Sequence, residues 1–466
     1  MRKTFKGALL ALSGLILSGC MTPDQGGGTR SAHATGEVTA RQVASLPSAL
    51  PPMKAFAGTR ISRPVQANAD IAGDFLDLSF QLESGRPLPY FSRFEGPVTL
   101  RVVGGAPAQM GQDLNRLMQR LRIEAGINIH QVPATQEASI TLEVISKRQL
   151  HALVPQAACF VAPNVSSWDE YKKLRKTAAT DWTKLKTRTK MSIFLPGDVA
   201  PQEMRDCLHE EVAQALGPVN DLYRLTNSVF NDDNFHTVLT GFDMLVLRAY
   251  YAPDLSSGMT RSEVAARLPA LLARLNPAGG SGLPRFQQPA PREWKVALET
   301  ALGQGVSMGR RRAAATSAVE IARAQGWYDT RLAFSLFAQG RLQLAIDANG
   351  AFAAFREADR IYRTTPGASL QAAHMGVQLA AYALSSGRAD EAISIIDPHI
   401  TSVKSAENAA LLSTLLMLKA EALDYAGRAT EAQLVRLDSL GWARYGFGSN
   451  AQVGARLREI AAISPG

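Results

Sequence analysis

A short sequence recurs near the C-terminus and limits how that part of the chain can fold. Residues 387–392 read Gly-Arg-Ala-Asp-Glu-Ala, and residues 427–432 read Gly-Arg-Ala-Thr-Glu-Ala, 40 positions later. Small residues at fixed positions let paired helices pack closely, and the glycine that opens each copy would end the first helix of a pair. A weaker unit lies around residues 328–362, and Pro398 should follow the second helix of the first full copy. The recurrence therefore predicts stacked helix pairs.

These units resemble tetratricopeptide repeats, in a degenerate form with long spacing. The resemblance implies an all-α domain over residues 293–466 that offers a groove to protein partners. The alternative is a generic helical bundle that reuses Gly-Arg, because a solenoid needs at least three repeats and two copies are clear.

A stretch rich in glycine and proline separates this part from the one before it. Residues 276–282 read Asn-Pro-Ala-Gly-Gly-Ser-Gly, and three more prolines follow by residue 291. Such composition is typical of a connection between domains. We expect a linker over residues 277–292 and a separate domain over residues 68–276, with its first secondary structure near Phe75.

The pattern before the linker alternates strands with helices. Short runs rich in β-branched and apolar residues predict strands, at residues 98–103, 140–145 and 191–195. Apolar residues at helical spacing predict a helix over residues 110–121, with Gly126 as its stop, and another over residues 202–216, ending before Gly217. This order predicts an α/β domain whose sheet has mixed direction.

The N-terminus has the features of an exported protein. Arg2, Lys3 and Lys6 precede an apolar run over residues 8–17, which is too short to span a bilayer as a helix. The run closes on Leu-Ser-Gly and Cys20, which resembles the lipobox of bacterial lipoproteins. The resemblance implies a signal peptide over residues 1–19, acyl chains such as palmitate on Cys20, and a flexible tether over residues 20–67.

The predicted location in the cell limits the classes of partner that the protein can bind. Met21 replaces the Asp that would suggest retention in the inner membrane, so we expect anchoring in the outer membrane, facing the periplasm. The formal net charge of +9 favours acidic surfaces such as lipid headgroups, and nucleic acid is not an expected partner outside the cytoplasm. One segment is rich in basic side chains. It forms either a binding patch for anionic headgroups or glycans, or a solvated face. The basic residues are Lys172, Lys173, Arg175, Lys176, Lys184, Lys186, Arg188 and Lys190.

Two cysteines remain once Cys20 is acylated. Cys159 and Cys207 form an even pair in an oxidising compartment, which predicts a disulfide between them. The alternative is a reactive thiol at Cys207 beside His209.

The helix after Cys207 carries the spacing of a zinc protease without its histidines. Metzincins use His-Glu-X-X-His-X-X-Gly-X-X-His, and aligning Gly217 with that glycine places Glu210, Gln214 and Asn220 at the three ligand positions. Glu211 then falls on the general base. Zinc prefers imidazole, thiolate and carboxylate, so this set would bind zinc poorly. Calcium suits the oxygen donors better, with Asp221 as a further carboxylate. The alternative is a buried helix whose polar side chains are satisfied by hydrogen bonds.

The same residues resemble an uncharacterised family of the bacterial envelope, domain of unknown function 2927. Residues 210–217 and 220–221 carry the signature, and further pieces match at residues 227–232, 242–245 and 252–259. The resemblance covers about residues 75–275. It implies a zincin-like α/β domain with an active-site-type helix and no assigned activity, and it aligns Met259 with the methionine turn of metzincins.

We therefore expect an envelope lipoprotein that acts by binding. A degenerate metalloprotease-like domain would recognise a partner in its former cleft, and the helical repeats would bind envelope proteins. We expect no cofactor, with calcium or zinc as the only candidates. The alternative is a divergent metal-dependent peptidase or hydrolase that uses Glu211 as base, with Glu210, Gln214 and Asn220 as ligands. Without an intact His-Glu-X-X-His motif, an enzyme is the less favoured hypothesis.

Overall fold

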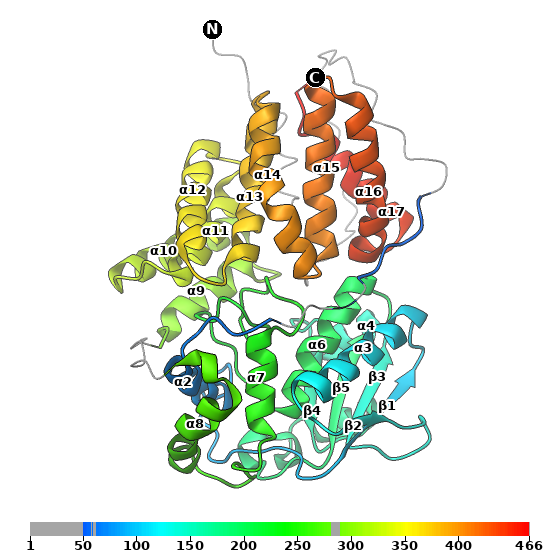
Figure 1. Cartoon of the computed structure of the whole chain (residues 1–466), viewed down its shortest axis with the longest axis vertical. Helices are drawn as coiled ribbons and strands as arrows, with labels where there is room; N and C mark the ends of the chain where they lie inside the picture. The colour runs from blue at the N-terminus through cyan, green and yellow to red at the C-terminus, as the bar shows by residue number, and fades with distance from the viewer. Residues whose placement is uncertain (1–49, 57, 59–61, 281–288, 466) are drawn as a thin grey trace. The chain divides into compact units, whose positions relative to one another are not determined.

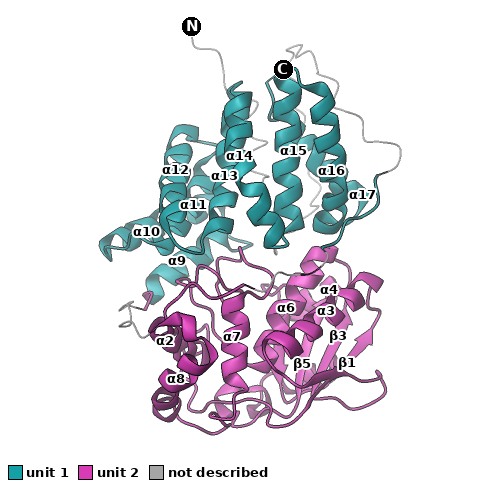
Figure 2. Ribbon diagram, viewed as in Figure 1, with its two compact units in different colours: residues 1–57, 292–466 teal, residues 58–291 magenta. Residues whose placement is uncertain are grey.

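The chain divides into two compact units, which are described separately (Figures 1 and 2). Residues 58–291 form the α/β unit, and residues 1–57 together with residues 292–466 form the helical unit. The predicted signal peptide, Cys20 and most of the predicted tether lie outside the described residues. The computed structural model describes residues 50–56, 58, 62–280 and 289–465.

One mixed sheet forms the centre of the α/β unit, with the strand order β2-β1-β3-β5-β4. The central strands β1, β3 and β5 run parallel, as does the edge strand β2, whereas β4 runs antiparallel to β5. The three predicted strands are therefore confirmed as the central three, and so is the mixed α/β class. The strands are β1 (Val98–Gly104), β2 (Ile129–Gln131), β3 (Ile140–Ile145), β4 (Phe160–Pro163) and β5 (Met191–Pro196).

The two edge strands were not predicted. β2 spans 3 residues and β4 spans 4 residues, which is too short for an alternating pattern to show. Both form because a longer central strand offers them a row of hydrogen-bonding groups. The sequence therefore indicates the centre of the sheet but not its edges.

Helices cover this sheet and share its core (Figure 1). The helix predicted over residues 110–121 is α3, and Gly126 follows its end with a φ of 69°. The helix predicted over residues 202–216 is α6. The helices of the α/β unit are α2 (Asn68–Ser79), α3 (Ala108–Glu124), α4 (Lys147–Leu153), α5 (Trp168–Leu174), α6 (Pro201–Leu216), α7 (Gly241–Tyr250) and α8 (Arg261–Leu275). Short 3₁₀ turns are η1 (Ala178–Thr180), η2 (Trp182–Lys184) and η3 (Pro277–Gly279).

A pair of buried asparagines ties the beginning of the α/β unit to its end. Asn68 Nδ2 donates to the carbonyl of Asn276 at 3.0 Å, and Asn276 Nδ2 donates to Asn68 Oδ1 at 2.9 Å. A Cβ on Gly279 would lie 2.2 Å from Asn68 Oδ1, so only glycine fits at this position beside the pair. The regular structure thus begins at Asn68, earlier than the expected position near Phe75.

The predicted disulfide is present. It joins Cys159, just before β4, to Cys207 in α6, and the two Cα atoms lie 6.0 Å apart. Cys207 is therefore no free thiol, and the alternative of a reactive cysteine is wrong. The bond links the antiparallel edge of the sheet to α6.

The helical unit contains no strand among its described residues. The predicted helix pairs around residues 328–362 and 382–432 are present, and short turns join successive helices. Its helices are α9 (Arg292–Leu302), α10 (Met308–Ala324), α11 (Thr330–Gln343), α12 (Ala348–Thr364), α13 (Ser369–Ser385), α14 (Ala389–Ser405), α15 (Ala409–Tyr425), α16 (Ala429–Phe447) and α17 (Asn450–Ala461).

Regular spacing and a repeated cap define the best-ordered pairs. Helices α13 to α16 begin 20 residues apart. Gly387 and Gly427 have φ values of 75° and 78°, a left-handed conformation that favours glycine. After each, an arginine N–H bonds to the carbonyl five residues earlier: Arg388 to Ala383 at 2.9 Å, and Arg428 to Leu423 at 2.8 Å. This is the Schellman geometry, so the recurring glycines end helices as predicted.

Pro398 does not follow a helix, and that expectation was wrong. It lies inside α14, which continues to Ser405. An interior proline removes one backbone donor and strains the turn before it. The helix continues because it packs against both α13 and α15 along its length.

Part of the predicted tether belongs to the helical unit. Residues 51–56, called the strap here, run along α16 without secondary structure of their own. In Figure 1 the strap is drawn in blue and lies next to the red helices near the C-terminus. Among the described residues, none of the helices combines the length and the apolar character that a membrane span requires.

Replacing Cys159 and Cys207 together by serine should lower the free energy of unfolding of the α/β unit by about 4 kcal/mol, because the bond closes a 48-residue loop. Urea denaturation with and without a reducing agent measures this. The reducing agent should have no effect on the double variant. A loss of stability confined to the helical unit would contradict the assignment.

Candidate metal centre

Close packing explains why α6 ends where the sequence suggests. A Cβ at Gly217 would lie 3.2 Å from Leu247 Cδ2 and 3.3 Å from the ring of Tyr250, both on α7. The φ of Gly217 is −153°, outside the left-handed region. The absence of a side chain at Gly217 therefore lets α7 pack closely at this position, and α6 ends here.

A buried arginine closes the end of α6. Arg188 is 3% exposed, and its guanidinium donates to the carbonyls of Gln214, Ala215 and Gly217. The hydroxyl of Tyr251 donates to the carbonyl of Leu216 at 3.0 Å. Carbonyls at a helix C-terminus lack partners within the helix, and a cation there opposes the negative end of the dipole. Arg188 thus belongs to the interior and not to a basic surface patch.

The irregular segment after α6 supplies the first acidic side chains of the centre. Asn220 is 1% exposed and donates through Nδ2 to the carbonyl of Asp77 at 2.9 Å. Asp221, next to it, is 5% exposed. Glu211 and Gln214 are buried on α6, while Glu210 is partly buried.

Three carboxylates from two distant parts of the chain meet at this place. One oxygen each from Glu83, Asp221 and Asp232 lie within 4.8 Å of one another. Oxygens bound to the same calcium ion at about 2.4 Å are at most about 4.8 Å apart, so the three can share one ion. Glu83 is exposed, Asp232 is partly buried and Asp221 is buried, which leaves a path from solvent.

Burial and the repulsion between neighbouring acids both raise the pKa values of carboxyl groups at this place. Burial, followed by the charges of Glu83, Asp232 and Asp206, raises the pKa of Glu210 to about 8. Burial, followed by Glu210 and Glu83, raises the pKa of Glu211 well above its ordinary value.

Asp221 behaves in the same way. Burial comes first, then the charges of Asp232, Glu83 and Glu210, and together they hold its pKa well above the ordinary value. In the described part of the chain, no basic side chain is among the groups that act most strongly on Glu210, Glu211 or Asp221. Acidic groups therefore dominate the electrostatics of Glu210, Glu211 and Asp221 within the described residues.

Among the residues that the structure describes, some buried oxygens in this region also have no hydrogen-bond partner. They are Oε2 of Glu211, Oδ1 of Asn220 and Oδ1 of Asp221. Burying an unsatisfied polar atom is costly, and native proteins rarely tolerate it without a water or an ion. Three such acceptors beside converging carboxylates point to a cation as the missing partner.

The donor set decides which cation fits. The zincin-like resemblance implies zinc, but the groups present are carboxylates and amides, without imidazole or thiolate. His209 does not supply one, because its Nδ1 accepts a bond from the N–H of Leu239 at 3.2 Å. Burial, with the positive charges of Arg205, Arg120 and Arg116, lowers the pKa of this histidine well below its ordinary value. The residues do not fit zinc, whereas an all-oxygen set is typical of calcium.

Of the residues predicted as ligands, Asp221 is in the converging group and Glu210 acts on it through its charge. Gln214 and Asn220 are buried, and their role as ligands stays a prediction. Met259 packs against the main core and accepts a bond from the N–H of Phe91, and its place beneath a metal stays a prediction.

Sequence reasoning missed Glu83 and Asp232. Glu83 lies in a tight turn where Leu82 N–H bonds to the carbonyl of Arg86, and its nearest predicted neighbour is more than a hundred residues away. Asp232 lies in an irregular segment with no periodicity. Its presence in a family motif at residues 227–232 was the only signal that could have identified it.

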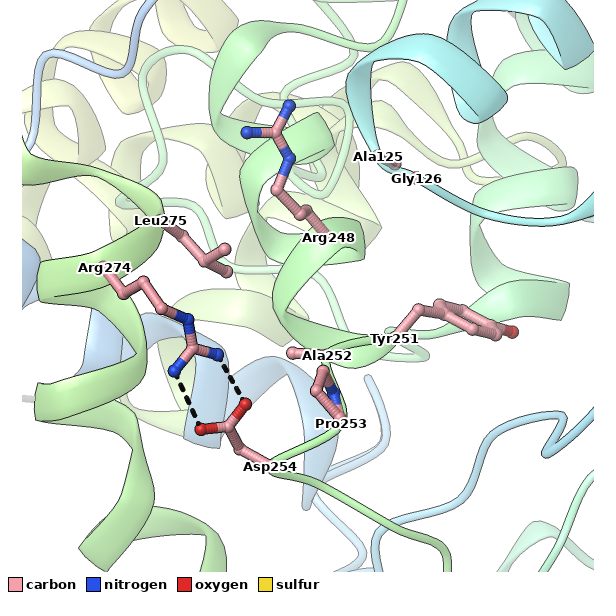
Figure 3. Close-up of a pocket in the computed structure, with 9 residues that line it drawn as sticks. All are labelled: Ala125, Gly126, Arg248, Tyr251, Ala252, Pro253, Asp254, Arg274 and Leu275. Atoms are coloured by element: carbon pink, nitrogen blue, oxygen red, sulfur yellow. Dashed lines mark hydrogen bonds and ion pairs between the residues drawn. The ribbon is translucent and has the colours of Figure 1, made fainter.

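An open pocket elsewhere in the α/β unit does not contain this centre. It has a volume of about 660 Å³ (Figure 3). Its charged side chains already have partners: Arg274 and Asp254 form a two-bond ion pair, and Arg248 Nε donates to the carbonyl of Glu124 at 2.7 Å. It therefore offers no converging set of groups. The pocket is lined by Ala125, Gly126, Arg248, Tyr251, Ala252, Pro253, Asp254, Arg274 and Leu275.

Comparison with known proteins supports the family resemblance. Residues 68–270 match the family model described as protein of unknown function (DUF2927). The match begins at the first residue of α2 and includes all the residues of the acidic centre. No curated protein and no solved structure matches the chain.

Replacing Arg188 by alanine should lower the free energy of unfolding of the α/β unit by about 3–5 kcal/mol, because several buried carbonyls lose a charged donor. Replacing it by lysine should recover part of this loss, since one ammonium cannot reach all the carbonyls. Denaturant unfolding measures both variants. An alanine variant as stable as the wild type would exclude this role.

Without metal, the α/β unit should lose stability as the pH rises from about 6.5 to about 8.5. A carboxyl group with a raised pKa holds a proton in the folded chain that the unfolded chain loses near pH 4.3, so folding is favoured at low pH. For Glu210 this contribution disappears as the pH passes about 8. The lowered pKa values of His209 and His236 act in the opposite direction, but only below about pH 6.5.

Thermal unfolding in a chelator at several pH values measures this dependence. Glu210→Gln should flatten it, whereas Glu137→Gln, on the surface of the same unit, should not. Stability that is constant or increases over this range would contradict the repulsion described here.

Proposed function

We propose that this protein is an envelope lipoprotein that acts by binding, and that its α/β unit holds a calcium ion. The observation that carries the proposal is the convergence of Glu83, Asp221 and Asp232 beside buried acceptors without partners. Calcium binds six to eight oxygens at about 2.3–2.6 Å in flexible geometry, which suits side chains from a turn and an irregular segment.

A calcium ion would act as a structural clamp in this unit. It would join the turn at residues 82–86 to the irregular segment at residues 219–240, which follows α6. These elements come from distant parts of the chain, and mutual repulsion of their carboxylates opposes their approach. A doubly charged ion removes this repulsion and satisfies the unpartnered oxygens.

The zincin-like ancestry remains part of the proposal. A mixed sheet with one antiparallel strand, followed by a helix with metzincin ligand spacing, supports it. A hydrolase would need Glu211 to be ionised and accessible. Glu211 is 3% exposed, and in the absence of metal its pKa is held well above the ordinary value. These observations favour binding over hydrolysis.

The other two parts of the proposal concern location and partners. The lipobox-like sequence ending at Cys20 supports an acyl anchor in the outer membrane. Stacked helix pairs with a repeated cap support a role of the helical unit in binding envelope proteins, as in other helical repeats.

Calcium titration of the chain starting at residue 21 tests the metal site. We expect one ion per chain, with a Kd between about 10⁻⁶ and 10⁻³ M. Asp221→Asn and Glu83→Gln should each weaken binding at least about tenfold, a loss of about 1.4 kcal/mol. Both variants remove repulsion, so the metal-free fold should be no less stable than that of the wild type.

Glu137→Gln serves as the matched control, because Glu137 is an exposed glutamate of the same unit outside the centre. Calcium binding that survives both changes in the centre would place the ion elsewhere. Tighter binding of zinc than of calcium would refute the all-oxygen site.

A further inference from the structure

The strap occupies one face of α16 through contacts of several kinds. The relevant positions on α16 are Asp438, Gly441, Trp442 and Tyr445, which follow the i, i+3, i+4, i+7 spacing of a single helix face. The strap has no secondary structure of its own. A continuous helix face thus holds a short unstructured segment of the same chain.

The aromatic side chain of Phe56 anchors the strap. It is 7% exposed and stacks on Trp442 with ring centroids 4.6 Å apart and an angle of 26° between the ring planes. Tyr445 meets the same ring edge-on, with centroids 6.3 Å apart. Large aromatic side chains buried in this way dominate the energetics of peptide recognition.

Lys54 contributes to the orientation of the strap on α16 and to the selectivity of the contact. Its backbone N–H donates to the carbonyl of Gly441 at 3.0 Å, and its ammonium pairs with Asp438. The ammonium also lies 5.6 Å from the centre of the Trp442 ring. Both members of the ion pair are exposed, so the pair contributes more to selectivity than to affinity.

A glycine in the middle of α16 makes room for this lysine. A Cβ at Gly441 would lie 2.9 Å from Lys54 Cγ and 3.1 Å from its Cδ. Glycine weakens a helix interior relative to alanine, so the presence of Gly441 inside α16 needs a packing reason. Contact with the strap provides that reason.

The N-terminal part of the strap consists of two prolines, and a side chain of α16 binds the backbone of one of them. Arg444 Nη1 donates to the carbonyl of Pro51 at 3.0 Å. Proline restricts the unbound chain, so Pro51 and Pro52 lose little conformational freedom when they are bound. This combination of prolines, a lysine and an aromatic residue is typical of segments recognised in an extended form.

The same face continues beyond the strap. Leu434 and Leu437, two turns and one turn from Gly441 toward the N-terminus of α16, are 65% and 44% exposed. They lie at i−7 and i−4 from Gly441, so they extend the face that the strap covers.

We propose that this face of α16 is a recognition site for extended polypeptide segments in which prolines precede Lys-X-aromatic, and that the strap fills it in cis. The partner is therefore an extended segment of that chemistry on another envelope protein, with the strap as its intramolecular competitor. A tethered competitor acts at an effective concentration of about 1 mM. A partner that makes the same contacts must therefore bind more tightly than the strap or be present at a comparable concentration. The proposal specifies the role of the helical unit in protein binding and shares no residue with the calcium centre.

A peptide of residues 50–57, Leu-Pro-Pro-Met-Lys-Ala-Phe-Ala, carrying a fluorescent label, tests the site. The protein is the chain from residue 21 with Lys54→Ser and Phe56→Ser, which should vacate the face. Fluorescence anisotropy should show micromolar binding to this variant. The wild type should bind the peptide at least about tenfold more weakly, because its own strap competes.

Two further changes in the vacated variant locate the peptide. Trp442→Ala should reduce binding at least about tenfold by removing the stacking partner. Gly441→Ala should also reduce binding by placing a methyl group against the lysine, and it improves the helix, so it cannot act by unfolding α16. A peptide with Phe replaced by Ala should not bind.

The proposal is overturned if the vacated variant does not bind the peptide, or if the wild type binds it equally well. It is also overturned if Gly441→Ala and Trp442→Ala both leave binding unchanged. Calcium binding should be the same in all these variants, so failure here is separable from failure of the metal site.

Discussion

The buried guanidinium of Arg188 is the contact on which the acidic centre depends. It binds carbonyls at the end of α6 and so sets where the helix stops and the irregular segment at residues 219–240 begins. Gly217 assists by admitting α7 at the same level. If the helix continued by one turn, Asp221 would rotate away from Glu83 and Asp232. The end of α6 is thus held by a cation that takes no part in the centre, from a segment whose other lysines and arginines are mostly exposed.

The acidic centre also shows how charge and burial oppose each other in this unit. Hydrophobic packing around α6 buries Glu211 and Asp221, although like charges raise the free energy of each. The fold accepts this cost in one of two ways, by keeping protons on the carboxyls or by replacing them with a cation. Protons, metal and folding are therefore linked at one place, and the state of the centre depends on the composition of the surrounding solution.

The sequence predicted elements with a regular period and missed those without one. The strands β1, β3 and β5, the helices α3 and α6 and the repeated glycine caps follow from alternation, helical spacing and turn chemistry. The edge strands β2 and β4 are too short to show a period, and Pro398 suggested a helix end that packing overrides. At the site, Glu210 and Asp221 were identified because a helix and its stop fix their spacing. Glu83 reaches the centre from a distant turn, and only the tertiary fold brings it there.

The hydrogen-bonded pair of Asn68 and Asn276 has a consequence for the ancestry of the chain. The strap and the helices from α9 onward belong to one unit, and the α/β unit interrupts that unit in the sequence. Because the inserted segment begins and ends at one place, the host fold need not stretch to accommodate it. Such a segment can enter or leave a gene as a cassette, so the family domain should also occur without these helices, and the helices without the domain.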